Sequence, residues 1–319
     1  MIISDNIEAI DCHYGGPEKT SAYLITQGDR ATFVDTNTNH AVPLLLAALE
    51  RRGIPRENVD YIIVTHVHLD HAGGAAALAA ACPNAQVIAH PKAARHLAAP
   101  ERLIASSKLV YGEEQFRQLY GEILPLAADR ITSVADESHL LWREHRLRFL
   151  HTAGHATHHI CIHDEATNTI FTGDTFGIGR SSRERPGIPF LIYSSSPTEF
   201  DAPAARISLA RILETGATTA CIGHFGAFDD LELGARQLMR VLGLYEGIQH
   251  AAADSGLQGE PLRDFCIDAM RTSLETFLRW CGVQDVASDL GWIGGDIALN
   301  GMGLAIAAER ERKKGAPQN

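Results

Sequence analysis

Residues 65–71 read T-H-V-H-L-D-H and place His66, His68, Asp70 and His71 directly after an apolar, strand-like run. Burying imidazoles and a carboxylate without partners costs free energy, and a bound cation would offset that cost. In extended backbone, residues i and i+2 point to the same side, so His66 and His68 form one group. Asp70 and His71 come from the turn that follows and reach a second point. The stretch therefore predicts a site for two metal ions.

Three later stretches share one feature, a metal-compatible side chain beside a glycine at the end of a strand-like run. They read H-T-A-G-H-A-T-H-H with His155, F-T-G-D-T with Asp174, and I-G-H-F-G with His224. Glycine lets the backbone come close to a ligand at such positions. The sixteen histidines are concentrated in residues 66–71 and 151–163. Histidines gathered after strands indicate a functional site rather than scattered packing residues.

The four stretches resemble, in the same order, the motifs of the metallo-β-lactamase-fold hydrolase superfamily. T-H-V-H-L-D-H is similar to its H-x-H-x-D-H signature, T-A-G-H-A-T-H-H to T-P-G-H-T-x-x-H, F-T-G-D to its G-D element and I-G-H to its closing G-H. The resemblance covers residues 1 to about 228. It implies a first metal held by His66, His68 and His155, a second held by Asp70, His71 and His224, and Asp174 bridging both.

Several neighbouring residues are weaker candidates. His159 matches the second histidine of the T-P-G-H-T-x-x-H element and is predicted as a catalytic residue that faces substrate or supports a ligand. Asp35, in F-V-D-T, resembles a strand-end aspartate that hydrogen-bonds behind the ligands. His158 stands where the family commonly has a small residue, so we expect it to alter the pocket. Four further residues could contact substrate, but we expect ordinary packing roles for them: His13, Arg180, Tyr193 and Phe225.

Strand-like runs occur in two groups, with helical patterns beside them in each half of the chain. The runs cover residues 7–12, 22–26, 31–34, 61–64, 86–89, 140–142, 147–151, 159–163, 169–172 and 218–222. With the resemblance, they predict an α/β fold, a four-layered α/β/β/α metallo-β-lactamase sandwich over residues 1–228. A helical C-terminal extension is expected over 229–319. A helical insert at 91–130 fits either a lid over the cleft or a packed helical pair without a catalytic role.

The residue types fit metal-dependent hydrolysis. Imidazoles and carboxylates suit Zn²⁺, and also iron or manganese. Two ions roughly 3.5–4 Å apart share a bridging hydroxide and polarise a substrate oxygen, so no serine or cysteine nucleophile is required. Asp70 is the expected catalytic residue because it can both ligate and orient that hydroxide. The predicted function is a dinuclear metal-dependent hydrolase that cleaves an ester, thioester or lactone of a small molecule.

The glyoxalase-II-like thioesterases and the acyl-homoserine lactonases are the branches that the ligand set resembles. The run G-D-T-F-G-I-G-R lacks the cysteine-glycine-lysine stretch of the thioesterases, which argues against a glutathione thioester. Substrate choice is expected to depend on the 91–130 insert, the 176–197 loop and the C-terminal helices. Two alternatives stay open: a mononuclear-iron sulfur dioxygenase on the same fold, and a regulatory protein that retains the metal site.

Composition limits the partners. The chain has 319 residues, of which 45% are hydrophobic and 21% charged, as in ordinary soluble globular proteins. A net charge of −11 argues against a nucleic-acid partner. The six cysteines are dispersed, without a C-x-x-C pair, as in reduced intracellular proteins. No secretory signal or membrane span is recognised. We therefore expect a cytoplasmic protein with a small-molecule substrate, and the C-terminal helices could also form a homodimer interface.

Overall fold

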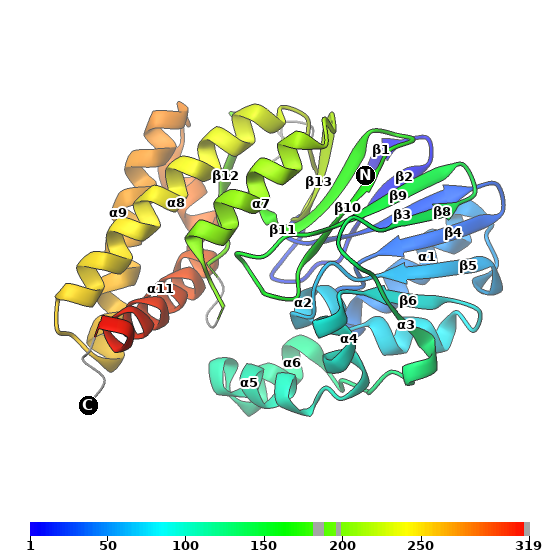
Figure 1. Cartoon of the computed structure of the whole chain (residues 1–319), viewed down its shortest axis with the longest axis horizontal. Helices are drawn as coiled ribbons and strands as arrows, with labels where there is room; N and C mark the ends of the chain where they lie inside the picture. The colour runs from blue at the N-terminus through cyan, green and yellow to red at the C-terminus, as the bar shows by residue number, and fades with distance from the viewer. Residues whose placement is uncertain (181–187, 196–198, 316–319) are drawn as a thin grey trace.

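The computed structural model describes residues 1–180, 188–195 and 199–315. Two β-sheets lie face to face, with helices on both outer sides (Figure 1). The first sheet has the strand order β1-β2-β3-β4-β5-β6-β7, and the second has β14-β13-β11-β10-β9-β8 with β12 beside β11. The α/β/β/α sandwich with added C-terminal helices is therefore confirmed.

The first half of the chain builds the first sheet and its helices. Its strands are β1 (Ile2–Ser4), β2 (Ile7–Asp11), β3 (Ser21–Gln27), β4 (Arg30–Val34), β5 (Val59–Ile63), β6 (Gln86–Ala89) and β7 (Ile131–Ser133). Its helices are α1 (Val42–Arg52), α2 (Leu69–Ala72), α3 (Ala75–Ala81), α4 (Pro91–Ala98), α5 (Glu101–Tyr111) and α6 (Glu113–Tyr120). Strands β4 to β7 run parallel, so a crossover must separate each strand from the next.

The second half builds the second sheet and the C-terminal helices. Its strands are β8 (His139–Trp142), β9 (His145–His151), β10 (Ile160–Asp164), β11 (Thr169–Arg180), β12 (Phe190–Ile192), β13 (Thr219–His224) and β14 (Ala227–Phe228). Its helices are α7 (Ala202–Glu214), α8 (Leu231–Asp254), α9 (Gly259–Cys281), α10 (Val286–Trp292) and α11 (Gly294–Gly315). Strands β11 and β13 pair in parallel, and α7 makes the crossover between them.

Alternation along the strands separates the apolar layers. In β3, Tyr23 and Ile25 face the second sheet, where they meet Phe171. Ala22 and Leu24, one residue out of phase, face the helices that cover the first sheet. This period of two is the pattern expected when both faces of a strand are buried. The core between the sheets fixes how the two halves of the chain face each other, and so where their loops meet.

The C-terminal helices share a core with the second sheet. Helix α8 packs on β11 and β12, while α9 and α11 pack on α8. A single apolar cluster runs from Phe176 and Leu191 of the sheet through Leu238 of α8 to Met270 and Leu304 of the later helices. The division at residue 228 stays a prediction, since no break in the core of the described residues marks it.

The insert is helical, as predicted, and glycines end its helices. Helix α5 ends at Gly112 (φ +78°) and α6 at Gly121 (φ +67°), in backbone conformations that favour glycine. These helices lie below α2 in Figure 1, with α11 above and to their left in that view. The insert is therefore placed at the same edge of the sandwich as the 65–71 stretch.

The loop expected over 176–197 is partly wrong. Strand β11 continues to Arg180 and pairs with β12, with Ile178 opposite Ile192. Glycines in this part of β11 allow the close strand approach: a Cβ on Gly179 would meet the Phe190 carbonyl oxygen at 1.9 Å. Residues 181–187 and 196–197 of the expected loop lie outside the described residues.

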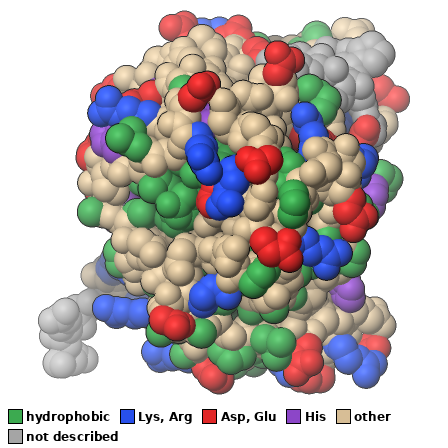
Figure 2. Space-filling model, turned by 90° about the vertical axis from the view of Figure 1, so that its right-hand side faces the viewer, with side chains coloured by type: hydrophobic (Ala, Val, Ile, Leu, Met, Phe, Trp, Pro, Cys, Tyr) green, Lys and Arg blue, Asp and Glu red, His purple; other side chains and the backbone are tan. Residues whose placement is uncertain are grey.

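The described surface mixes both signs of charge. On the face drawn in Figure 2, Lys and Arg side chains lie among Asp and Glu rather than gathering into one basic area. No single helix among the described residues has both the length and the hydropathy to cross a bilayer, and α10 with α11 meets that test only as a pair bent by 65°.

Phe171 provides a test of the core between the sheets. It is fully buried and its ring meets Tyr23 edge-on at 5.3 Å. Phe171→Ala should lower the free energy of unfolding by about 3–5 kcal/mol, because the cavity adds to the lost burial. Leu141→Ala in β8, where the side chain is 75% exposed, should change it by less than about 0.5 kcal/mol. Similar losses for both variants in urea unfolding would contradict the assigned core.

Candidate metal centre

The 65–71 stretch changes from extended to helical backbone, as the sequence predicted. Strand β5 ends at Ile63, and His68 still has extended dihedrals (φ −60°, ψ 144°) where it precedes α2. Asp70 and His71 lie in the single turn of α2. One short segment therefore offers two histidines from extended chain and two further ligands from a helical turn.

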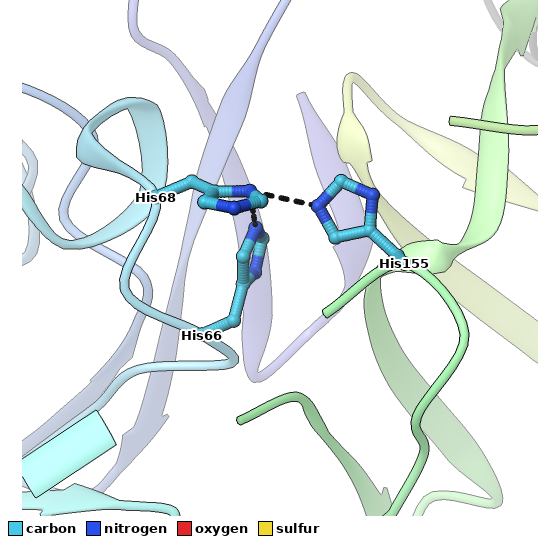
Figure 3. Close-up of side chains that lie close together, drawn as sticks. All are labelled: His66, His68 and His155. Atoms are coloured by element: carbon cyan, nitrogen blue, oxygen red, sulfur yellow. Dashed lines mark hydrogen bonds between the residues drawn. The ribbon is translucent and has the colours of Figure 1, made fainter. Parts of the chain in front are cut away.

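The first group of donors consists of His66, His68 and His155 (Figure 3). The Nε2 atom of His66 lies 3.1 Å from Nδ1 of His68, and Nε2 of His155 lies 2.8 Å from that same Nδ1. His155 comes from the loop between β9 and β10, so this group joins the two sheets. Three ring nitrogens that converge at such distances match the donor set of a single metal ion.

The second group consists of Asp70, His71 and His224. The Asp70 Oδ2 atom lies 3.7 Å from Nε2 of His71 and 4.0 Å from Nε2 of His224. His224 is the last residue of β13, in the second sheet. A carboxylate oxygen and two imidazole nitrogens again meet at one point, at the end of a strand.

Asp174 lies between the two groups. Its Oδ1 atom is 3.0 Å from Nε2 of His71 and 3.4 Å from Nε2 of His224, whereas its Oδ2 atom is 3.4 Å from Nε2 of His155. The register of β11 against β13 shifts on both sides of Gly173. Such an irregularity re-aims a side chain within a strand. The two oxygens of Asp174 are thus placed to bridge two ions.

Fixed acceptors behind the rings determine which nitrogen is free. Nδ1 of His71 lies 2.9 Å from Asp35 Oδ2, and Nδ1 of His155 lies 3.0 Å from the Ser194 carbonyl oxygen. Since these oxygens only accept, in the neutral form of each ring Nδ1 carries the proton and Nε2 keeps a lone pair. Asp35 therefore has the supporting role expected from the sequence.

The electrostatics also suit cations. Burial lowers the pKa of His66, His68 and His155, so these rings are neutral ligands at pH 7. Burial would likewise lower the pKa of His71 and His224, but the Asp174 carboxylate outweighs it and raises both. The second group thus needs positive charge to balance its carboxylates, and a metal ion supplies it.

Two buried atoms lack the partners that buried polar atoms normally have. His71 Nε2 and Asp174 Oδ1 are buried, and neither has a hydrogen-bond partner of good geometry among the described residues. The two atoms lie 3.0 Å from each other and belong to a group of possible metal ligands. The residues present therefore fit the two-metal site that the motifs imply.

A cavity of about 390 Å³ opens onto these donors. Its wall includes His96 of α4, residues 102–111 along one side of α5, and Tyr120 of α6. Asp296, Leu299 and Asn300 of α11 form part of the same wall. The insert and the last helix thus line the cavity, which argues against an insert that only packs. Movement of the insert as a lid stays a prediction.

The contacts of His159 do not support a direct catalytic role. Its Nδ1 atom lies 2.9 Å from Thr152 Oγ1 and 3.1 Å from Thr175 Oγ1, and its Nε2 atom accepts from the Asp174 backbone N–H at 3.2 Å. The described cavity wall does not include it. Both ring nitrogens are therefore committed to protein groups, and the ring holds Asp174 in position from behind.

The other weak candidates divide as follows. His158 lines the cavity, as its unusual identity suggested. Ordinary contacts account for Arg180, which pairs with Asp289 at 2.5 Å, and for the buried Tyr193 and Phe225. Sequence reasoning missed Tyr111, Tyr120, Arg102, Glu199 and Asp296 as cavity residues. Their only signal was polar or aromatic character, within helices for all but Glu199, and this is also typical of surface positions.

Comparison with known proteins agrees with this geometry. The family model of the metallo-beta-lactamase superfamily matches residues 15–224. The metallo-beta-lactamase fold-containing protein ST1585 of Sulfurisphaera tokodaii is 25% identical over 211 residues, covering 65% of this chain and 75% of that protein.

Two solved structures show the similarity of fold. The metallo-beta-lactamase family protein TTHA1429 from Thermus thermophilus has a TM-score of 0.65 and 20% identity, covering 98% of this chain and 95% of that one. The structure of ST1585 from Sulfolobus tokodaii has a TM-score of 0.59 and 19% identity, covering 87% and 98%. The first of these similarities extends over the C-terminal helices as well as the sandwich.

Gly223 offers a test that leaves every donor in place. A Cβ there would meet His71 Cε1 at 2.6 Å and Asp174 Oδ1 at 3.1 Å. Gly223→Ala should therefore weaken metal binding about 10- to 100-fold, the size of effect seen when ligand orientation is disturbed. Competition against a chromophoric chelator measures it. Gly247→Ala in α8, with nothing within 4 Å of the added carbon, should bind as the wild type does; equal affinity in both variants would contradict the geometry.

Proposed function

Because the chain belongs to the metallo-β-lactamase superfamily, we propose that it is a dinuclear metal-dependent hydrolase acting on an ester, thioester or lactone of a small molecule. One observation carries the proposal: two separate donor groups share Asp174 at the floor of one cavity. His66, His68 and His155 would hold one ion, and Asp70, His71 and His224 the other. Zn²⁺ suits these donors best, and iron and manganese are the other candidates.

The metal ions, when bound, lower the pKa of a coordinated water to about 7 and polarise a substrate oxygen. The protein's own residues then position the reactants. Asp70 has a side chain that is 19% exposed, against 4% for Asp174. Both carboxylates line the cavity, and Asp70, the more exposed of the two, can accept a hydrogen bond from the attacking water. The His159 ring holds Asp174 from behind, and Asp174 keeps the two donor groups in fixed positions relative to each other.

The shape of the cavity supports a small substrate. Apolar side chains of Leu103, Val110, Ile178 and Leu299 share its wall with the hydroxyls and charges. A volume of about 390 Å³ lies in the range of small-molecule sites. A substrate with one polar, cleavable group and a modest apolar part fits this mixture.

Turnover can be measured against aryl esters, thioesters and lactones after loading the protein with zinc, iron or manganese. We expect hydrolysis of at least one class, loss with a chelator and recovery on adding metal. Asp174→Ala should lower kcat/KM by more than the roughly 10- to 100-fold typical of residues behind the ligands, because it disturbs both ions. Asp129→Ala, on the exposed surface, is the matched control. Absence of turnover in every class would overturn the hydrolase proposal.

Metal content separates the proposal from a redox enzyme on the same fold. The two donor groups predict two metal ions per chain by elemental analysis, with Asp70→Ala losing the ion held by His71 and His224 first. A single iron per chain, with oxygen uptake that depends on a persulfide, would instead identify a sulfur dioxygenase. A regulatory protein would retain its biological role in Asp174→Ala, whereas a hydrolase would not.

A further inference from the structure

Three tyrosines from distant parts of the chain meet beside the donor groups. Tyr14 lies between β2 and β3, Tyr111 ends α5 and Tyr120 ends α6. The hydroxyl oxygens of Tyr14 and Tyr120 are 2.8 Å apart, and their rings stack at 5.8 Å with an interplanar angle of 28°. The rings of Tyr111 and Tyr120 meet edge-on at 5.7 Å. We call these residues the tyrosine cluster.

The cluster faces the reaction site. Tyr111 and Tyr120 line the same cavity as Asp70 and His224, while Tyr14 lies behind them. An apolar group that includes Leu69 of α2 and Phe116 of α6 surrounds the rings and leaves Tyr120 only 2% exposed. The phenol rings are therefore fixed by packing, and Tyr111 and Tyr120 share the cavity wall with Asp70 and His224 of the second donor group.

The surroundings keep the hydroxyls protonated. Burial raises the pKa of all three tyrosines, and the nearby Asp70 carboxylate raises it further. A phenol that remains neutral offers one O–H donor and can still accept from a neighbour. A hydroxyl that accepts from another becomes a stronger donor in turn. Tyr14 can thus polarise Tyr120 toward a group in the cavity.

We propose that Tyr111 and Tyr120 donate hydrogen bonds to the carbonyl oxygen of an acyl substrate, with Tyr14 as a positioning residue behind them. The inference rests on the proposed hydrolase function and narrows its substrate to carbonyl compounds. As a water oxygen bonds to the acyl carbon, the C=O electron pair moves onto the carbonyl oxygen, and the two O–H groups stabilise its negative charge. When C=O re-forms, the bond to the leaving group breaks, and the leaving group takes the proton that the water gives up.

The donors suit an oxygen that becomes charged only during the reaction. Asp70 and Asp296 both act on Tyr111. Asp296 lines the cavity, where His224 and Lys19 are the cations that act on it. A carbonyl oxygen is neutral in the substrate and acquires negative charge as the reaction proceeds. Donors aimed at such developing charge act mainly on the transition state.

Phenylalanine substitutions remove the donors and keep the rings. In the metal-loaded full chain, the double variant Tyr111→Phe/Tyr120→Phe should lower kcat on aryl acetates about 10- to 100-fold, with KM changed less than about threefold. Metal content should match the wild type. Tyr61→Phe removes the same hydroxyl from β5, outside the described cavity wall, and should change neither constant. A kcat within about threefold of wild type, or a loss confined to KM, would overturn the proposal.

Two further measurements identify the oxygen involved. Across aryl acetates whose phenols differ in acidity, the double variant should lose kcat by the same factor, because the donors bind the carbonyl oxygen. A loss of kcat that grows with the pKa of the leaving group would place the donors on the leaving group and overturn the assignment.

Binding of ketones, measured by calorimetry, provides the second test. The double variant should lose affinity for a trifluoromethyl ketone, whose hydrate resembles the tetrahedral oxyanion, but not for the methyl ketone. If the double variant binds the trifluoromethyl ketone as tightly as the wild type does, only the role of the tyrosines is refuted. If the wild type itself shows no turnover, the hydrolase function is refuted.

Discussion

The carboxylate of Asp35 is the contact on which the metal centre depends most. It accepts from the Thr65 backbone N–H at 2.7 Å, from the Thr65 hydroxyl and from Nδ1 of His71. Its backbone lies in the left-handed region (φ +61°), which is uncommon for a residue other than glycine. The end of β4 is therefore turned back so that one carboxylate holds both ends of the 65–71 stretch. The Thr65 hydroxyl also contacts Nδ1 of His66, so the support extends to the first donor group.

The same loop also clamps the backbone of the helical turn. Asn37, again with a positive φ, donates from Nδ2 to the Asp70 carbonyl oxygen at 2.7 Å. A Cβ on Gly74 would meet the Thr38 carbonyl oxygen at 2.9 Å, so the close approach requires glycine. Strain at these two left-handed residues is compensated by hydrogen bonds that a free loop would lack. Protein contacts thus hold the donors on α2 in position, which limits the conformational entropy lost when a metal ion binds.

Charge balance explains why the two sheets must meet here. Burial alone would raise the pKa of Asp174, but His71 and His224 hold it well below the usual range. His71 belongs to the first half of the chain, whereas Asp174 and His224 belong to the second. The packing of Phe171 against Tyr23 brings these halves together, and the buried carboxylate then requires positive charge from both. The same arrangement therefore stabilises the contact between the two sheets and forms a site suited to a metal ion.

The metal centre could be predicted from sequence because its residues obey a local rule. His66, His68 and His224 lie at or just after the ends of strands, and the spacing within residues 65–71 determines which side chains face together. The continuation of β11 was missed because Gly173, Gly177 and Gly179 look like loop residues, although partner backbone lies within 3 Å of a Cβ on Gly177 or Gly179. The choice between the two roles of His159 could not be made from sequence for a related reason. The position of His159 in the motif predicts that its ring lies near the metal donors. Only the packing shows that both ring nitrogens bond to other protein groups.

The tyrosine cluster lies beyond any local rule, since Tyr14 and Tyr120 are separated by 106 positions and meet only because the insert folds back over α2. Within α6, Tyr120 follows Phe116 at helical spacing and looks like one more apolar contact. The hydroxyl changes that interpretation, because a buried O–H must find a partner and here finds other hydroxyls beside a cavity. Metal donors come from the motifs at the strand ends of the sandwich, whereas much of the cavity wall comes from α5, α6 and α11. The candidate metal donors and much of the cavity wall are thus encoded in separate segments, so changes in the insert can alter the cavity while those donors remain in place.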